Sequence, residues 1–434
     1  MKKRALIMSR SETHDERDLV LLLVSMGLNS LPWGYMLVVL PIYLADIGYS
    51  GALIGLVTSV SSIANTIALI PFAIVADRYG RKPFVIAGFL ASTAAYLLFA
   101  FTRDLNSLLL ASGLGGVGLA GGFSSAVWTP AWTAMLAEKA HERRTGAFAW
   151  SQGVWTVALT VGSTMSVIPF FLRTSMNVPF GSSYEYSFLI LAGLALVSGI
   201  IPLPVSERLP EPRTMKEGDS RKWLRVKSHS QIAKFSITVG LVGFASGLGV
   251  QLLSLWFYRA YGTSETLLGP WFAAAEATSL VVVPLVPRLT RKFGSSLTVM
   301  LTQGISAILL AVMVLAPTYQ LAAMLYVVRN FFMNIAWPIQ QSYLMGTVEP
   351  DERASASAIT YTVWSAGSSI SPLMAGYLLG GSSFTSISAP IWGGGAVYFA
   401  SAVIFYLFFR RISPPEEADI AMRGGPSLAR SGVE

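Results

Sequence analysis

The sequence has 434 residues, of which 53% are hydrophobic and only 12% are charged, and its formal net charge is +8 at neutral pH. A soluble domain carries about a quarter charged residues, so this chain has too little charge to cover a water-exposed surface. The absence of cysteine excludes disulfides and thiolate metal sites. The three histidines, His14, His141 and His229, lie in predicted loops, which excludes a histidine metal centre within a membrane.

Apolar segments follow one another along the whole chain, and most are long enough to cross a hydrocarbon layer of about 30 Å as helices. They are residues 19–44, 54–75, 84–101, 106–135, 148–171, 187–201, 235–258, 267–287, 297–315, 319–344, 357–379 and 390–409. We therefore predict an all-α integral membrane protein with twelve transmembrane helices. The amino-terminal stretch lacks a signal-peptide pattern, so the first segment is expected to be an uncleaved anchor.

Basic residues are concentrated on one side of this topology. If both termini and the loops after even-numbered segments share a side, that side holds 27 of the 31 lysines and arginines. Such asymmetry is typical of a cytoplasmic face. We predict a multi-pass protein of the cell membrane, surrounded by lipid, with both termini in the cytoplasm. The positive charge is then explained by topology, and nucleic-acid binding is not expected.

The two halves of the chain resemble each other at a fixed spacing. Three residues before the second segment match three before the eighth: Gly48, Ser50 and Gly55 match Gly262, Ser264 and Gly269. At the same spacing, residues 77–80 fall on residues 291–294, and further on Trp128 and Trp155 match Trp337 and Trp364. Repeated bundles are common in transporters. We predict two pseudo-symmetric six-helix bundles, residues 19–205 and 231–411, with cytoplasmic tails at 1–18 and 412–434 and a linker at 206–230.

A charged stretch, "ADRYGRKP", interrupts the apolar sequence between the second and third segments. It contains Asp77, Arg78, Gly80, Arg81 and Lys82. The basic residues would hold this loop in the cytoplasm, and glycine permits a tight turn. The carboxylate of Asp77 would face helix amino termini of the other bundle, which stabilise negative charge. The alternative is that the stretch only anchors the topology.

With this motif, a degenerate copy "VPRLTRKFGS" and "GSSISPLMAG" in the eleventh segment, the chain resembles the major facilitator superfamily over nearly its whole length. It departs from the family pattern at Ala73, usually glycine, and at Arg291, which replaces the aspartate of the second copy. The resemblance implies a monomeric secondary transporter of small molecules, without a cofactor, that is not an enzyme. It also implies that the charged stretch latches the outward-facing state and that the solute binds near the midplane, between segments one, four, seven and ten.

Polar and aromatic residues within the spans are candidates for the solute cavity. The predicted set is Asn29, Trp33, Tyr35, Trp128, Trp132, Gln152, Trp155, Gln251, Asn330, Asn334, Trp337, Gln341, Tyr361 and Trp364. The four in the tenth segment form one helical stripe, and amides facing lipid are costly. For any single residue, hydrogen bonding between packed helices remains the alternative.

These residues favour an uncharged, amphipathic or weakly anionic solute, and efflux is the leading hypothesis. Against it, the fifth segment lacks the glycine-proline signature that drug-proton antiporters of the family usually carry. Uptake of a sugar or organic acid is the alternative, and a receptor or enzyme on the same scaffold is less well supported.

Two ionisable residues lie well inside the spans, Glu276 and Arg329. Each costs about 2.5 to 3.5 kcal/mol at a helix centre on insertion scales, so they should face the cavity or each other. Glu276 could carry a proton whose release is coupled to solute movement, with Arg329 as its partner or as a site for an anionic group. A fixed structural ion pair is the alternative.

A reporter fused after Glu434 tests the predicted topology. An enzyme reporter that works only in the cytoplasm should be active, because most basic residues lie on the side of both termini. Activity of a reporter that requires the exterior would contradict it.

Overall fold

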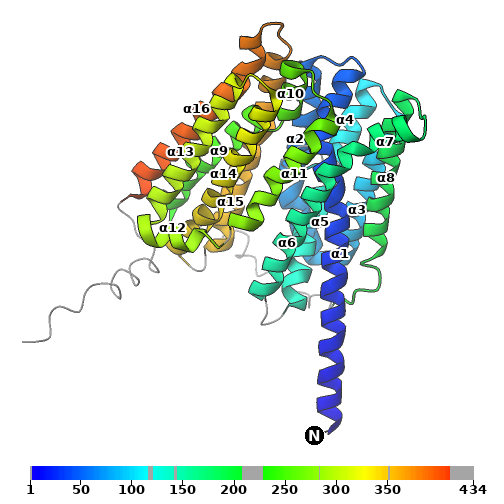
Figure 1. The fold of residues 1–434 in the computed structure, drawn as a ribbon. Helices are drawn as coiled ribbons and strands as arrows, with labels where there is room; N and C mark the ends of the chain where they lie inside the picture. The colour runs from blue at the N-terminus through cyan, green and yellow to red at the C-terminus, as the bar shows by residue number, and fades with distance from the viewer. Residues whose placement is uncertain are drawn as a thin grey trace, which may run out of the picture.

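The computed structural model describes residues 2–115, 121–140, 144–207, 228–282, 284–349 and 352–410. Within these ranges every regular element is helical (Figure 1). Residues 208–227 of the predicted linker and the tail from residue 411 lie outside them. The helical character of every described element confirms the predicted all-α class.

The helices of the first half of the chain cover the first six predicted segments. They are α1 (Lys2–Asp46), α2 (Gly51–Tyr79), α3 (Lys82–Phe101), α4 (Leu105–Leu114), α5 (Phe123–Lys139), α6 (Arg144–Thr164), η2 (Met165–Val167), α7 (Ile168–Ser175) and α8 (Phe180–Ile200). The sixth segment is longer than predicted, because the polar first turns of α8 hid its start at Phe180. The fourth is divided into α4 and α5, where a continuous helix was predicted.

The second half repeats this organisation. Its elements are α9 (His229–Gly249), α10 (Leu253–Tyr261), α11 (Glu265–Val282), α12 (Val286–Phe293), α13 (Ser295–Val312), η4 (Met313–Leu315), α14 (Tyr319–Thr347), α15 (Arg353–Leu379) and α16 (Phe384–Phe409). The predicted seventh segment is broken between Gly249 and Leu253. In Figure 1 the helices of the two halves form two groups, side by side.

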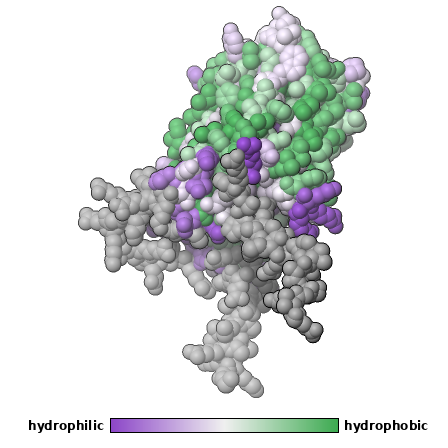
Figure 2. Space-filling model, turned by 90° about the vertical axis from the view of Figure 1, so that its left-hand side faces the viewer, coloured by the Kyte–Doolittle hydropathy of each residue, from purple (hydrophilic) through white to green (hydrophobic). Residues whose placement is uncertain are grey.

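The surface and the helix lengths fit a membrane. Figure 2 shows a broad apolar band on one face, bounded below by hydrophilic residues. In the described part of the chain, eight helical spans are long and apolar enough to cross a bilayer, or nine if the pair α11 and α12, bent by 62°, is one span. The number of twelve crossings stays a prediction.

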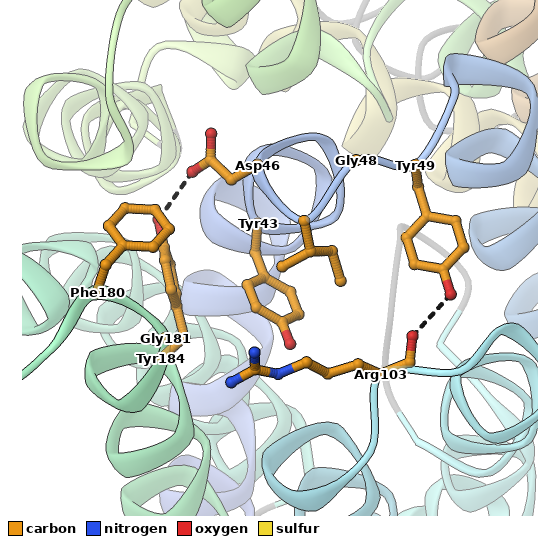
Figure 3. A pocket seen from close by; sticks show the side chains of 9 residues that line it. Tyr43, Asp46, Gly48, Tyr49, Arg103, Phe180, Gly181 and Tyr184 are labelled. Atoms are coloured by element: carbon orange, nitrogen blue, oxygen red, sulfur yellow. Dashed lines mark hydrogen bonds between the residues drawn. The ribbon is translucent and has the colours of Figure 1, made fainter.

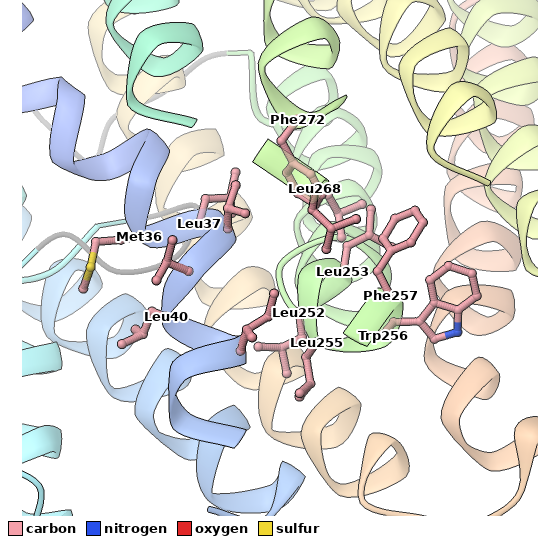
Figure 4. Close-up of a cluster of buried hydrophobic side chains, with 14 of the residues drawn as sticks. Met36, Leu37, Leu40, Leu252, Leu253, Leu255, Trp256, Phe257, Leu268 and Phe272 are labelled. Atoms are coloured by element: carbon pink, nitrogen blue, oxygen red, sulfur yellow. The ribbon is translucent and has the colours of Figure 1, made fainter. Parts of the chain in front are cut away.

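The two ends of the molecule differ in how their cores are packed. We call the end with Asp77 the motif end and the end with Arg173 the opposite end. At the opposite end, one hydrophobic core joins both halves. Leu37 and Leu40 of α1 lie in the same cluster as Leu252, just before α10, and residues of α10 and α11 (Figure 4). At the motif end each half has a separate core. The halves are thus closed at the opposite end.

Glycines allow this closure. A Cβ atom on Gly55 of α2 would overlap the carbonyl oxygen of Pro372 in α15, and one on Gly376 would overlap that of Gly51. On the other side of the interface, a Cβ on Gly269 of α11 would overlap the Ser166 side chain in η2. Small residues let membrane helices approach to backbone contact, so two helix pairs hold the halves together at this end.

Substitution of Gly55 by alanine should weaken the closed packing. The added Cβ meets backbone, which cannot move aside, and overpacking costs about 1 to 3 kcal/mol. We expect a lower midpoint of thermal unfolding in detergent. Gly193→Ala in α8 is the matched control, because its Cβ would meet no atom within 4 Å. Equal midpoints for both variants would contradict the role of Gly55.

Candidate functional site

The charged turn begins where α2 ends at Tyr79. Gly80 has a φ of +100°, which other residues rarely adopt, and α3 begins two residues later at Lys82. The Arg81 guanidinium lies 3.1 Å from the Asp77 carboxylate and 3.4 Å from that of Glu138 in α5. Arg81 therefore joins α2, α3 and α5.

Glu207 and Lys139 continue this network at the motif end. The Glu207 carboxylate accepts hydrogen bonds from the backbone amides of Arg81 and Lys82. Lys139 lies 2.9 Å from Asp15 and 2.7 Å from Asp18. Burial tends to lower the pKa of Lys139, but hydrogen bonds to these two carboxylates raise it above its ordinary value.

Three residues of the charged turn, Asp77, Arg81 and Lys82, contact the first half in this conformation. The Asp77 side chain is 65% exposed, and its hydrogen-bond partner is Arg81. The described hydrogen bonds and salt bridges of Asp77, Arg81 and Lys82 all join residues of the first half. Among the described residues, the Asp77 carboxylate therefore forms no salt bridge or hydrogen bond with the second half.

Several predicted cavity residues lie on exposed or half-buried faces of the spans. Trp33 and Trp155 pack edge to face, with ring centroids 4.9 Å apart, between α1 and α6. The ring of Trp364 packs near two others, with ring centroids 5.7 Å apart for Tyr361 and 6.3 Å apart for Trp337. Gln152 is exposed and Gln341 is half-buried. Aromatic surface within an apolar span is available to a solute by stacking.

Four other members of the predicted set contact neighbouring helices of their own half. Trp128 packs on Phe89 of α3, and Trp132 donates a hydrogen bond to the carbonyl of Leu22, at 2.9 Å. Asn330 donates to the carbonyl of Ala275, at 2.8 Å, and Asn334 to the hydroxyl of Thr278, at 3.1 Å. For these four, helix packing explains the polar and aromatic character in this conformation.

Three other predicted residues, Asn29, Tyr35 and Gln251, are buried. Tyr35 packs against Phe188. The side-chain oxygen of Asn29 and both amide atoms of Gln251 have no hydrogen-bond partner among the described residues. Gln251 lies in the break between α9 and α10. Most buried polar groups are hydrogen-bonded, and broken helices often form binding sites in transporters, so this break is a candidate for solute or water contact.

Glu276 and Arg329 do not form an ion pair in the described part of the chain. Arg329 is 2% exposed and its guanidinium lies 5.0 Å from the ring centroid of Tyr398. One of its nitrogens donates to Asn330, while the other two lack hydrogen-bond partners. Glu276 is half-buried on α11. The fixed structural ion pair, which was the alternative to proton coupling, is therefore not present among the described residues in this conformation.

An apolar groove of about 520 Å³ lies between α1, α6 and α11, and the sequence did not predict it. Every residue that lines it is apolar or glycine, including Val24 and Leu28 of α1, Val157 of α6 and Leu280 of α11. Both halves therefore contribute to it. Glu276 precedes Leu280 by one helical turn, on the same face of α11.

A second cavity, of about 450 Å³, lies at the opposite end within the first half (Figure 3). Tyr43, Asp46, Arg103 and Tyr184 are among its lining residues. Its charged groups already have partners: Asp46 accepts a hydrogen bond from Tyr184, at 3.2 Å, and Arg103 forms a salt bridge with Glu185. No predicted cavity residue lines it. Among the described side chains, no group of three or more metal-ligating residues could hold a metal ion.

Together these features define a polytopic α-helical membrane protein of two similar halves, closed at one end and carrying a charged turn at the other. The model of the major facilitator superfamily matches residues 22–372 and, in an overlapping match, 235–432. The chain belongs to this family. Since it is a family of transporters, the prediction that the chain is not an enzyme is confirmed.

The relatives found by sequence are distant. An uncharacterized MFS-type transporter of Mycobacterium tuberculosis is 27% identical over 58% of this chain and 57% of its own length, so the match spans little more than half of that relative. Multidrug resistance protein 1 of Bacillus subtilis is 23% identical over 83% of this chain and 89% of its own. The class H tetracycline resistance protein of Pasteurella multocida is 21% identical over 92% and 98%.

Solved structures confirm the fold. The nucleoside transporter NupG (D323A mutant) superposes with a TM-score of 0.72, at 15% identity, over 90% of this chain and all of that chain. An inward-facing, occupied bacterial homologue of the human lysosomal transporter Spinster gives 0.69, at 15% identity, over 90% and 96%.

Proposed function

We propose that this protein is a secondary transporter that exports a small amphipathic solute by alternating access between residues 19–205 and 231–411. The observation that carries the proposal is the apolar groove lined by both halves, with Glu276 one turn from Leu280. Such a surface can hold the apolar part of a solute by the hydrophobic effect, while the carboxyl group contacts its polar part. The drug-resistance relatives support export.

The separate cores at the motif end indicate which state this is. Because the excess of positive charge favours the cytoplasm for the motif end, closure at the opposite end would correspond to an inward-facing state. The charged turn would then act in the other state of the cycle, in which the motif end is closed. When the motif end closes, the exposed Asp77 would reach helix amino termini of the second half, where a carboxylate is stabilised.

Asp77→Asn should slow transport by about tenfold, within the range usual for coupling between two states, because the latch loses its charge. The measurement is the solute efflux rate at equal protein levels. Glu138→Gln is the matched control, since Glu138 pairs with the same Arg81 but lies on α5 of the first half and is outside the predicted latch. Equal slowing by both changes would mean that only the position of Arg81 matters.

Proton coupling would be carried by Glu276. Arg329 keeps its charge in proteins, and its unpartnered nitrogens make it costly in the interior unless an anion approaches. An ionised Glu276, or an anionic group of the solute, would satisfy it. A protonated Glu276 would leave Arg329 free for the solute. Binding of proton and solute would then be linked through these two side chains.

Glu276→Gln should separate solute movement from the pH gradient. We expect a folded variant that exchanges solute across proteoliposomes but no longer accumulates it when a pH difference is imposed. Glu185→Gln, the same chemical change at the opposite end, should keep accumulation. Full pH-driven accumulation by the Glu276→Gln protein would remove this residue from the mechanism. Loss of folding that Arg329→Met restores would instead identify a structural pair.

A further inference from the structure

One salt bridge at the opposite end joins the two halves directly. A guanidinium nitrogen of Arg173, in α7 of the first half, lies 2.8 Å from a carboxylate oxygen of Glu265, the first residue of α11 in the second half. The Glu265 side chain is 3% exposed and that of Arg173 is 23% exposed. The other salt bridges between described residues remain within the first half.

Arg173 is held in position by its own half. Its Nε donates a hydrogen bond to the carbonyl oxygen of Pro169, at 3.1 Å. Its guanidinium lies 4.9 Å from the ring centroid of Phe180 and 5.6 Å from that of Tyr184, both in α8. Cation–π contact and the backbone hydrogen bond fix the direction of the guanidinium, so less freedom is lost when Glu265 arrives.

Glu265 is placed to depend on this partner. As the first residue of α11, its carboxylate is stabilised by the free amides of the helix amino terminus. It is also almost fully buried, and a buried charge without a partner is strongly destabilising. Gly269, one turn further along α11, is the residue in backbone contact with the first half. The salt bridge and the close packing therefore form and break together.

We propose that Arg173 and Glu265 are the lock that keeps the opposite end closed, and that breaking their salt bridge shifts the protein toward the state open at that end. This inference rests on the proposed transport cycle. It predicts a change in conformational equilibrium that can be measured without any solute, so it can be tested even if the class of solute is wrong.

The test uses thiol labelling, because the chain has no cysteine of its own. Leu40 is 1% exposed and lies in the core that joins the halves at the opposite end. A single cysteine at this position, Leu40→Cys, should react slowly with a polar maleimide in nanodiscs while that end is closed. Adding Arg173→Met or Glu265→Gln should raise the labelling rate by about fivefold or more, the lower limit of usual coupling energies.

The matched control is the salt bridge between Arg103 and Glu185, which lies at the same end but within the first half. Arg103→Met and Glu185→Gln should leave the labelling rate of Leu40→Cys unchanged. The exchanged pair, Arg173→Glu with Glu265→Arg, should restore slow labelling in part. An unchanged rate in the Glu265→Gln protein, or an equal rise in the Arg103→Met protein, would overturn the proposal.

Discussion

The two halves meet at the opposite end through backbone contact, and the rest of the architecture depends on that approach. Any side chain on Gly55, Gly269 or Gly376 would separate the helices that carry it from their partners. With the helices at this distance, apolar residues of α1 and α10 fall into one core. The same closeness brings Arg173 within reach of Glu265. Helix packing in lipid depends on such contacts, because lipid tails are as apolar as the side chains.

The described salt bridges lie at the two ends of the molecule. At the motif end, Arg81 and Lys139 fasten helices of the first half to one another and leave Asp77 exposed. At the opposite end, the salt bridge between Arg173 and Glu265 crosses between the halves. Within the spans, Glu276 and Arg329 remain apart. A charge in the interior is costly without a partner, so in the proposed cycle the buried charges would favour the state in which they are paired.

Much of the fold could be predicted from the sequence, because long apolar runs and a repeated motif directly indicate membrane helices in two halves. The turn at Gly80 was also predictable, since glycine marks a backbone conformation that other residues avoid. The division of the fourth and seventh segments was not, because a break inside an apolar run leaves hydrophobicity unchanged.

The candidate site was predicted less well. Periodicity places residues on one face of a helix but does not say what that face contacts. Trp132 and Trp337 therefore looked alike, although the first donates a hydrogen bond to α1 and the second is 38% exposed. The apolar groove could not be predicted from the sequence, because valine and leucine are ordinary residues of a membrane span. The pair Arg173 and Glu265 is 92 residues apart in the chain, and only the folded structure brings it together.

The break between α9 and α10 bears on the free energy of opening in the proposed cycle. The Gln251 amide has no hydrogen-bond partner among the residues that the structure describes. Gln251 directly precedes Leu252 and Leu253, which belong to the core shared by both halves. Opening this core exposes apolar surface to water, which is unfavourable. Water that enters would also hydrate the Gln251 amide, and hydration of an unsatisfied amide lowers the free energy. In the proposed cycle, this hydration would offset part of the free-energy cost of opening at the same place.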